Sequence, residues 1–409
     1  MFSLVADKTG SIKSDFLAKI FQTDSLRSCK RIMEDAFVSS HETFDVYSKS
    51  LRSLFREFAR IRIYPRGCKF SEEMTNLAPD GRVPEMIRVS LGSAIMLGLV
   101  KGSLDALPTT VYLLTYRKGK CDANCAFCPQ AKNSKSRADM LSRVSWPSLT
   151  TLQIINAIPN AVKSGRIKRV CIQALNYPSV FNDVISVVSC IRSKCNVPIS
   201  VSCQPVEIET MKELATAGVE RIGIPLDAAN EEIFNKTKGK QADGPYDWNQ
   251  QLQALEVAVH VFGKGKVSTH LIVGLGETEK DMTCIIQRCV DMSVNPGLFA
   301  FTPISGTRLE SSAPPLLGQY RRIQLARYLI VTEKTRYDKM SFDSDGKIID
   351  FGVSDDALHE MVMSGFPFVT SGCPNCNRPY YNERPGGLLY NYPSMPMKAE
   401  LAEMEKVFK

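Results

Sequence analysis

The sequence predicts an α/β fold, in which parallel strands and helices form a full or partial (β/α) barrel of the TIM type. From about residue 109 onward, short β-rich segments alternate with helical segments, a pattern typical of a parallel sheet with helical crossovers. No β-rich segment is followed by the GxGxxG fingerprint of an open dinucleotide-binding sheet. Six such units in succession therefore favour a barrel, in which ligands gather at the C-terminal ends of the strands.

The predicted strands are short and separated by helical segments. The strands cover residues 111–117, 169–175, 197–203, 221–227, 266–274 and 297–304. The helical segments between them include residues 148–165, 207–218, 249–263 and 277–292. We therefore place the barrel at residues 109–345.

Two segments flank this barrel. Residues 1–108 are expected to form a helical N-terminal extension, because apolar residues recur at three- and four-residue steps in residues 14–37 and 42–61. Residues 346–409 form a cysteine-bearing C-terminal tail, which is rich in Pro, Gly, Asn and Tyr over residues 371–396. Such a tail has little core of its own, so we expect it to cap the barrel mouth.

The composition is that of an ordinary soluble globular protein. Hydrophobic residues make up 44% and charged residues 23% of the 409 residues, and no apolar run approaches the roughly 18 residues of a membrane span. The N-terminus lacks a secretory pattern, so we expect a cytoplasmic protein whose 13 cysteines are buried or bind metal. The net charge of +8 suits an acidic partner, but its scattered distribution does not indicate nucleic-acid binding, and no membrane is expected as a partner.

Three cysteines lie within eight positions directly after the first predicted barrel strand. Cys121, Cys125 and Cys128 have the spacing Cys-x3-Cys-x2-Cys. Cubane iron–sulfur clusters usually take four thiolates, so three local ligands leave one iron free to bind another molecule. A zinc site completed by a histidine or a distant cysteine is the alternative.

This motif, with Phe127 just before its last cysteine, resembles the signature of the radical S-adenosylmethionine (SAM) enzymes. In that family the free iron of a [4Fe-4S] cluster chelates the amino and carboxylate groups of SAM, and one electron cleaves SAM to a 5′-deoxyadenosyl radical. The resemblance implies that the three cysteines hold this cluster. It also implies that Phe127 packs near the adenine.

Within the superfamily, CDANCAFCPQ is similar to the biotin synthase version of the motif. The segment LIVGLGETEKD resembles the fifth-strand segment of the same group, in which the turn of Gly274, Gly276 and Glu277 lies against the adenosine. Glycine at these positions lets the backbone approach a flat ligand closely. Asp227 matches a residue that contacts substrate or SAM, although it would also serve as the cap of the following helix.

The resemblance covers roughly residues 86–345 and breaks at the second cluster of biotin synthase. That cluster is held by three strand-borne cysteines and an arginine. Cys171 and Cys203 match two of the cysteines, but the fifth strand carries Ser268 and His270 where the third is expected, and the arginine is also missing. Dethiobiotin is therefore not the expected substrate.

The tail supplies further thiols. Cys373 and Cys376 form a Cys-x2-Cys pair with a proline between them, which alone would be half of a zinc knuckle. Together with Cys171 and Cys203 the pair would complete a four-cysteine site if the tail folds over the barrel. Cys68 is a fifth candidate, which would replace one barrel thiol.

A biotin-synthase-like barrel with a cysteine-bearing tail resembles the archaeal-type, two-component lipoyl synthases. The resemblance implies sulfur insertion into unactivated C–H bonds of a protein-bound octanoyl group, with a sacrificial auxiliary iron–sulfur cluster. It implies three partners: a second radical SAM lipoyl synthase subunit, an octanoylated carrier protein (a lipoyl domain or the glycine cleavage H protein), and ferredoxin or flavodoxin as electron donor.

Two alternatives stay open at this point. One is another biotin-synthase-like radical SAM enzyme, either a biotin synthase or an isomerase or lyase without a sacrificial cluster. The other is a non-catalytic zinc- or nucleic-acid-binding protein that uses the three-cysteine motif and the tail pair as two half-sites.

Overall fold

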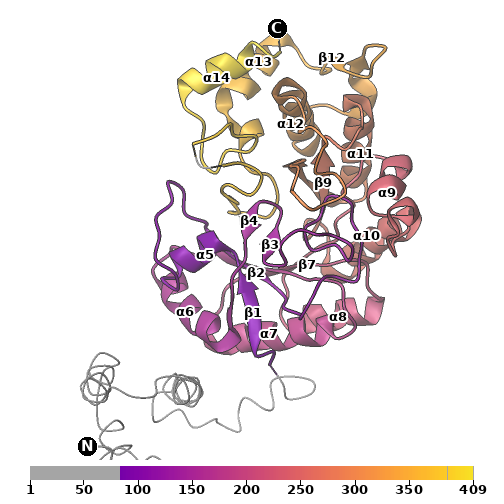
Figure 1. Ribbon diagram of the computed structural model, residues 1–409. Helices are drawn as coiled ribbons and strands as arrows, with labels where there is room; N and C mark the ends of the chain where they lie inside the picture. Colours follow the sequence, from indigo (N-terminus) through magenta and orange to yellow (C-terminus); the bar gives the residue numbers. More distant parts are fainter. Residues whose placement is uncertain (1–82, 385, 409) are drawn as a thin grey trace, which may run out of the picture. The chain divides into compact units, whose positions relative to one another are not determined.

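The computed structural model describes residues 83–384 and 386–408, and an eight-stranded sheet lies at their centre (Figure 1). Six of its strands are parallel and follow one another in chain order across the sheet. They are β2 (Thr110–Leu114), β6 (Arg169–Gln173), β7 (Ile199–Ser202), β8 (Arg221–Gly223), β9 (Val267–Val273) and β10 (Val294–Ala300). Each overlaps one predicted strand. Within the described residues β10 ends the sheet, so the predicted α/β barrel fold is confirmed in its partial form.

Two antiparallel strands extend the other side of the sheet. Strand β1 (Met86–Val89) pairs with β2, and β5 (Ser148–Thr150) pairs with β1. The expected helical extension includes residues 86–89, and for these residues the expectation is wrong. The segment is only four residues long, and as a strand it buries Ile87 and Val89 against the core. A pattern of only four residues does not distinguish a helix from a strand, so the burial of these two side chains decides the conformation. Residues 1–82 lie outside the described residues.

Helices connect the parallel strands and cover the outer face of the sheet (Figure 1). They are α5 (Leu91–Met96), α6 (Thr151–Lys163), α7 (Val180–Lys194), α8 (Ile208–Thr216), α9 (Glu231–Thr237), α10 (Trp248–Phe262), α11 (Glu279–Asp291) and α12 (Leu317–Val331). Local signals fix several helix starts: Asp247 caps α10, and Thr278 and Asp281 form a capping box on α11. None of the described helices is long and apolar enough to cross a membrane.

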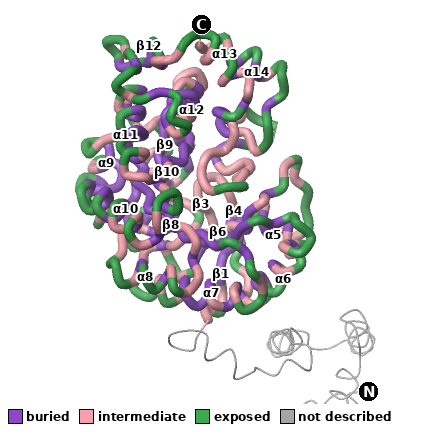
Figure 2. Tube along the Cα trace, turned by 180° about the vertical axis from the view of Figure 1, so that it is seen from behind, coloured by how far each residue is buried: buried purple, intermediate pink, exposed green. Residues whose placement is uncertain are grey.

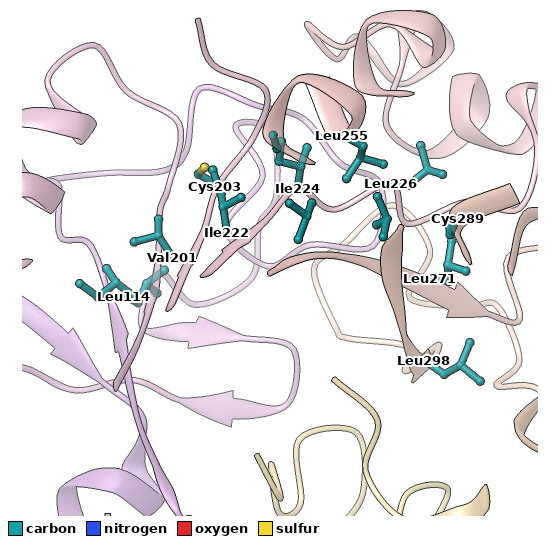
Figure 3. Close-up of a cluster of buried hydrophobic side chains, with 14 of the residues drawn as sticks. Leu114, Val201, Cys203, Ile222, Ile224, Leu226, Leu255, Leu271, Cys289 and Leu298 are labelled. Atoms are coloured by element: carbon teal, nitrogen blue, oxygen red, sulfur yellow. The ribbon is translucent and has the colours of Figure 1, made fainter. Parts of the chain in front are cut away.

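The core lies between the sheet and these helices. Buried apolar side chains from successive strands, among them Val201, Ile222, Leu271 and Leu298, meet Leu255 of α10 in one cluster (Figure 3). Buried residues follow the strands, whereas exposed residues follow the outer helices and loops (Figure 2). This rigid framework sets the positions of the loops at the strand ends.

Beyond α12 the chain forms small elements and a long irregular tail. They are β11 (Ser341–Phe342), β12 (Ile348–Asp350), α13 (Asp355–Ser364) and α14 (Lys398–Glu405), and a further hairpin, β3 (Met140–Leu141) with β4 (Val144–Ser145), lies earlier in the chain. The tail between α13 and α14 turns inward toward the sheet.

The tail bridges the two outer parallel strands. On one side the backbone N–H of Leu298 in β10 donates to Ser371 Oγ at 2.9 Å. On the other side the N–H of Thr109, just before β2, donates to Asn377 Oδ1 at 3.0 Å. These contacts place this part of the tail along the open side of the partial barrel, and its expected role as a cap of the barrel mouth stays a prediction. This part completes the enclosure that the strands leave open.

Candidate active site

The three-cysteine loop lies where the fold predicts an active site. It follows β2 at the C-terminal end of the sheet, and Cys121, Cys125 and Cys128 all line one open cavity of about 1050 Å³. Asp227 after β8 and Ala300 at the end of β10 line the same cavity. The parallel strands thus bring the three thiols together with side chains that are about 100 or more positions away in the sequence.

Backbone and side-chain hydrogen bonds fix this loop to a second loop that follows α9. The N–H of Ala126 donates to the carbonyl of Thr237 at 2.7 Å, and Asn124 Nδ2 donates to the carbonyl of Ala242 at 2.8 Å. Asn124 is itself buried. The loop therefore has a defined conformation that holds the cysteines in place.

Burial makes two of the three thiols weak acids. Burial raises the pKa of Cys125 and raises that of Cys128 to about 12, so neither thiol ionises readily without a bound cation. The N–H of Asn176 donates to Cys121 Sγ at 3.0 Å, and hydrogen bonds of this kind stabilise a thiolate. The donor set therefore fits a cluster with three thiolate ligands.

The three thiols suit a cubane, in which each thiolate binds a different iron. Among the described residues, no three Cys, His, Asp or Glu side chains are grouped as the ligands of a single ion. The zinc site considered above stays the alternative.

Asp227 lies in the cavity wall and does not cap a helix. The cap of α9 is Asn230, whose side chain accepts from the N–H of Ile233 at 3.0 Å, so the helix-cap alternative for Asp227 is wrong. Asp227 has φ of +68°, a conformation that costs free energy in a residue other than glycine. Its carboxylate accepts from Lys238 Nζ at 2.8 Å, and both side chains are almost fully buried.

The predicted adenosine turn is held by its own glutamate. Glu277 accepts from the N–H groups of Gly274 at 2.6 Å and Leu275 at 2.9 Å. Gly274 and Gly276 have φ of +105° and +112°, where glycine is favoured. A Cβ on Gly274 would lie 2.8 Å from Pro315 Cδ, so the close approach there is to the protein. Contact of this turn with adenosine stays a prediction, whereas Phe127 does line the cavity.

A second, inner cavity of about 580 Å³ lies against the first. The two cavities share a wall formed by Gln173, His270, Phe299 and Tyr381. The Phe299 and Tyr381 rings meet edge to face with centroids 5.5 Å apart, and His270 packs on Phe299 at 4.7 Å. Burial lowers the pKa of His270 to about 4, so the imidazole is neutral at pH 7. None of the three rings in this wall therefore carries a charge.

The inner cavity brings together three of the five predicted auxiliary ligands. Cys171 of β6 and the tail residues Cys373 and Cys376 all line it. Hydroxyl groups lie beside the tail thiols, with Tyr112 Oη 3.1 Å from Cys376 Sγ and Ser200 Oγ 3.6 Å from Cys373 Sγ. The tail thus brings its thiols into the partial barrel, beside the barrel thiol of Cys171.

Cys203 is not part of this group, so the predicted four-cysteine site is wrong in one ligand. Cys203 lines the outer cavity, and burial alone raises its pKa, with no contribution from another thiol. Ser200 on the same strand faces Cys373, and Cys203 lies about 10 Å farther along the chain at roughly 3.3 Å per residue. The other predicted ligand, Cys68, lies outside the described residues.

Comparison with known proteins identifies the family. Residues 117–289, which include the three cysteines, match the radical SAM superfamily. The matched stretch is a radical SAM domain. The family implies a [4Fe-4S] cluster and SAM as cofactors of this domain, and Cys121, Cys125 and Cys128 are the residues that would hold the cluster.

One curated protein and two solved structures illustrate what this chain is similar to. The biotin synthase of Synechococcus sp. (strain JA-3-3Ab) is 25% identical over 237 residues, which are 55% of this chain and 70% of that protein. Among solved structures, methylornithine synthase is 15% identical with a TM-score of 0.43, over 55% of this chain and 62% of that one. The hydrogenase maturase HydG from Carboxydothermus hydrogenoformans is also 15% identical with a TM-score of 0.43, over 59% and 55%. The chain spans less than two thirds of these two structures.

Proposed function

We propose that this radical SAM protein is a lipoyl synthase component that inserts sulfur into unactivated C–H bonds of an octanoyl group on a carrier protein. The observation that carries the proposal is the shared wall between the two thiol-lined cavities. Sulfur insertion needs a radical generator and a sulfur source within reach of one substrate carbon. The two cavities supply these two positions side by side.

The chemistry would come from the bound groups. SAM bound to the first cluster would supply a 5′-deoxyadenosyl radical that removes a hydrogen atom from the substrate carbon, and a second cluster would supply the sulfide and accept one electron. The chain's own residues hold and separate the reactants. Cys121, Cys125 and Cys128 would hold the SAM-binding cluster, and Phe127 and Asp227 lie in the wall of the cavity that would receive SAM.

The shared wall suits an alkyl substrate. Phe299 and Tyr381 present aromatic surface, and the neutral ring of His270 adds no charge. An octanoyl chain placed along this wall would exchange water for apolar surface, which favours its burial.

Positive charges at the cavity mouth fit an acidic carrier. Arg143 lies in the turn of the β3–β4 hairpin beside Ser142, and Arg384 lies two residues after Asn382; both Ser142 and Asn382 line the outer cavity. Burial and the positive charge of Arg384 lower the pKa of Arg143, which shows that the two guanidinium groups lie near each other. Among the described residues, neither arginine forms an ion pair with a carboxylate, although Glu383 lies close enough to act on Arg143.

The remaining partners follow from the proposed reaction. The octanoyl group would arrive on a lipoyl domain or the glycine cleavage H protein, and a second radical SAM subunit would complete the pair of sulfur insertions. Each cleavage of SAM consumes one electron, which ferredoxin or flavodoxin would supply. We place this system in the cytoplasm, where such reduced carriers and thiols coexist.

The test is anaerobic reconstitution followed by mass spectrometry of an octanoyl-lysine peptide, with and without the second radical SAM subunit. The proposal predicts a mass gain that corresponds to sulfur and depends on SAM and reductant. An unchanged peptide mass in the presence of both subunits and active SAM cleavage would remove lipoyl synthesis as the function.

A second candidate is an isomerase or lyase of the biotin-synthase-like group, which has no sacrificial cluster. Iron and sulfide analysis separates the two: two cubane clusters give about eight iron atoms per chain, whereas one gives about four. The tail thiols inside the partial barrel favour two clusters, which give about eight iron atoms per chain. A colourless protein that contains zinc and forms no 5′-deoxyadenosine would instead support the non-catalytic alternative.

A further inference from the structure

The inner cavity is built by two segments that are about 200 residues apart in the sequence. Cys171 lies on β6, and Cys373 and Cys376 lie on the tail loop. The loop is bent by Gly372 at φ of +136° and Asn375 at φ of +63°, and the N–H of Cys376 donates to the carbonyl of Cys373 at 3.1 Å. This tight turn places both tail thiols on the same cavity as Cys171.

The three thiols are close enough to influence one another. All three line one cavity, and Ser200, the register partner of Cys171 on the neighbouring strand β7, lies with its Oγ 3.6 Å from Cys373 Sγ. Among the described residues no fourth thiol lines this cavity, so a metal group held here would have one position without a cysteine ligand.

Hydrogen-bond donors surround the thiols. Gln173 Nε2 donates to Cys171 Sγ at 3.1 Å, and the Tyr112 hydroxyl lies 3.1 Å from Cys376 Sγ. Trp146 also lines the cavity and is 1% exposed, yet no group in the described part of the chain accepts from its Nε1–H. A buried N–H without a partner is costly, and such groups in native proteins usually face an unseen acceptor.

We propose that the inner cavity holds an iron–sulfur cluster on Cys171, Cys373 and Cys376, one iron of which has no cysteine ligand, and that the Trp146 indole N–H donates to a cluster sulfur. This inference rests on the proposed function and deepens it by assigning the ligands of the sulfur source. Sulfide is an anionic acceptor. It would accept a hydrogen bond from the Trp146 indole N–H, and the positive side chains near the site would stabilise its charge. Arg169, which donates to Ser200 Oγ at 2.9 Å, and Arg378, whose guanidinium lies 3.8 Å from the Phe299 ring centroid, are both within this region.

A zinc ion would satisfy the same residues less well. Three thiols and the imidazole of His270, which also lines the cavity, would form a Cys3His zinc set, so the Trp146 indole and the metal analysis below distinguish zinc from the cluster. A zinc ion also offers no acceptor for Trp146, because it carries no sulfide. The cluster accounts for the thiols and the indole together.

The first experiment counts iron and sulfide in anaerobically reconstituted full-length protein. Cys171→Ser and the double variant C373S/C376S are expected to lose about half of the iron and still cleave SAM, which shows that the barrel is folded. Cys203→Ser, the matched control from the outer cavity, is expected to keep the full iron content. Full iron in the first two variants, loss of the extra iron in Cys203→Ser, or zinc in place of the extra iron would overturn the assignment.

The second experiment isolates the inner site in a C121S/C125S/C128S background, where only the inner cluster remains. Because hydrogen bonds to sulfur raise a cluster's reduction potential, Trp146→Phe is expected to lower the potential without loss of iron. Trp248→Phe, in α10, is the matched control and is expected to leave the potential unchanged. An unchanged potential in Trp146→Phe would refute the indole contact. In the wild-type protein, full iron content and active SAM cleavage with no sulfur transfer to octanoyl peptide would refute the proposed function alone.

Discussion

The buried ammonium of Lys238 donates to the Asp227 carboxylate at 2.8 Å, directly behind the three-cysteine loop. Lys238 also donates to the carbonyl of Pro225, and it lies 5.3 Å from the Tyr246 ring centroid. It is fully buried and does not line the cavity, whereas Asp227 does. Lys238 therefore acts as a positioning residue for Asp227.

The first prediction concerns this pair. Lys238→Met leaves the Asp227 carboxylate buried without its partner, so we expect a loss of about 3–5 kcal/mol in the free energy of unfolding. We also expect weaker SAM binding, because Asp227 would leave its strained conformation at φ of +68°. Urea unfolding and SAM titration of the reduced protein measure the two effects.

Lys236→Met is the matched control for this prediction. Lys236 lies two residues earlier and pairs with Glu232 on the exposed face of α9. An exposed pair of this kind contributes less than about 1 kcal/mol. Equal losses in the two variants would show that Lys238 has no special role at the site.

The second prediction concerns acid stability. Because burial lowers the pKa of His270 to about 4, the unfolded chain takes up this proton before the folded protein does. The contribution of neutral His270 is fully present above about pH 6.5 and falls as the pH drops toward 4. Between pH 7.5 and 5 we expect this residue to cost about 2 kcal/mol, at about 1.4 kcal/mol per pH unit.

Urea unfolding of wild type and His270→Asn at the two pH values measures this effect. The variant is expected to lose less stability on acidification than wild type. His359→Asn, which changes an exposed histidine on α13, is the control and is expected to follow wild type. An identical acid loss in wild type and His270→Asn would contradict the prediction.

The third prediction concerns the carrier. Reversal of charge in R143E/R384E is expected to raise KM for an octanoylated carrier at least tenfold, because attraction to an acidic partner becomes repulsion. The effect should shrink as salt screens these charges. Turnover of a short octanoyl-lysine peptide should change much less, since the peptide lacks the acidic surface.

The control for this prediction is K168E/K194E. Both lysines are exposed and lie at the opposite end of the strands, before β6 and at the end of α7. The net charge change is the same, so a general charge effect would appear in both variants. A KM rise of the same size in the control would exclude a docking role for the two arginines.

The fourth prediction separates two glycines of one turn. Ala at Gly276 meets open space, so only its φ of +112° costs free energy, about 1–2 kcal/mol. Ala at Gly274 has a similar φ and also places Cβ 2.8 Å from Pro315 Cδ, so we expect a larger loss. Thermal unfolding of both variants measures the two losses of stability. Equal losses would show that Pro315 shifts to accommodate the new Cβ at no cost in free energy.

The strands and the cysteine loop could be predicted because their signals are local. β-rich segments alternate with helical ones, and the motif at Cys121, Cys125 and Cys128 follows a strand, so both positions could be read directly from the sequence. Strand β1 was missed because four residues after a long loop carry too little pattern to distinguish strand from helix. Its conformation depends on pairing with β2.

The composition of the inner site depends on tertiary structure. Cys171 lies on one predicted strand and Cys203 at the end of the next, but only Cys171 lines the cavity of the tail thiols. Lys238 lies in a stretch of alternating lysines that is typical of an exposed loop, and Trp146 follows a short hairpin strand. Nothing local to either residue indicates that its side chain is buried beside a cavity.

The most direct test of the account is electron–nuclear double resonance of the reduced, anaerobically reconstituted protein with SAM labelled at its carboxylate carbon. We predict a coupling between the label and the cluster spin that is absent in Cys125→Ser, because three thiolates leave one iron for SAM. A reduced cubane that shows no such coupling, with SAM present in excess, would contradict the central claim.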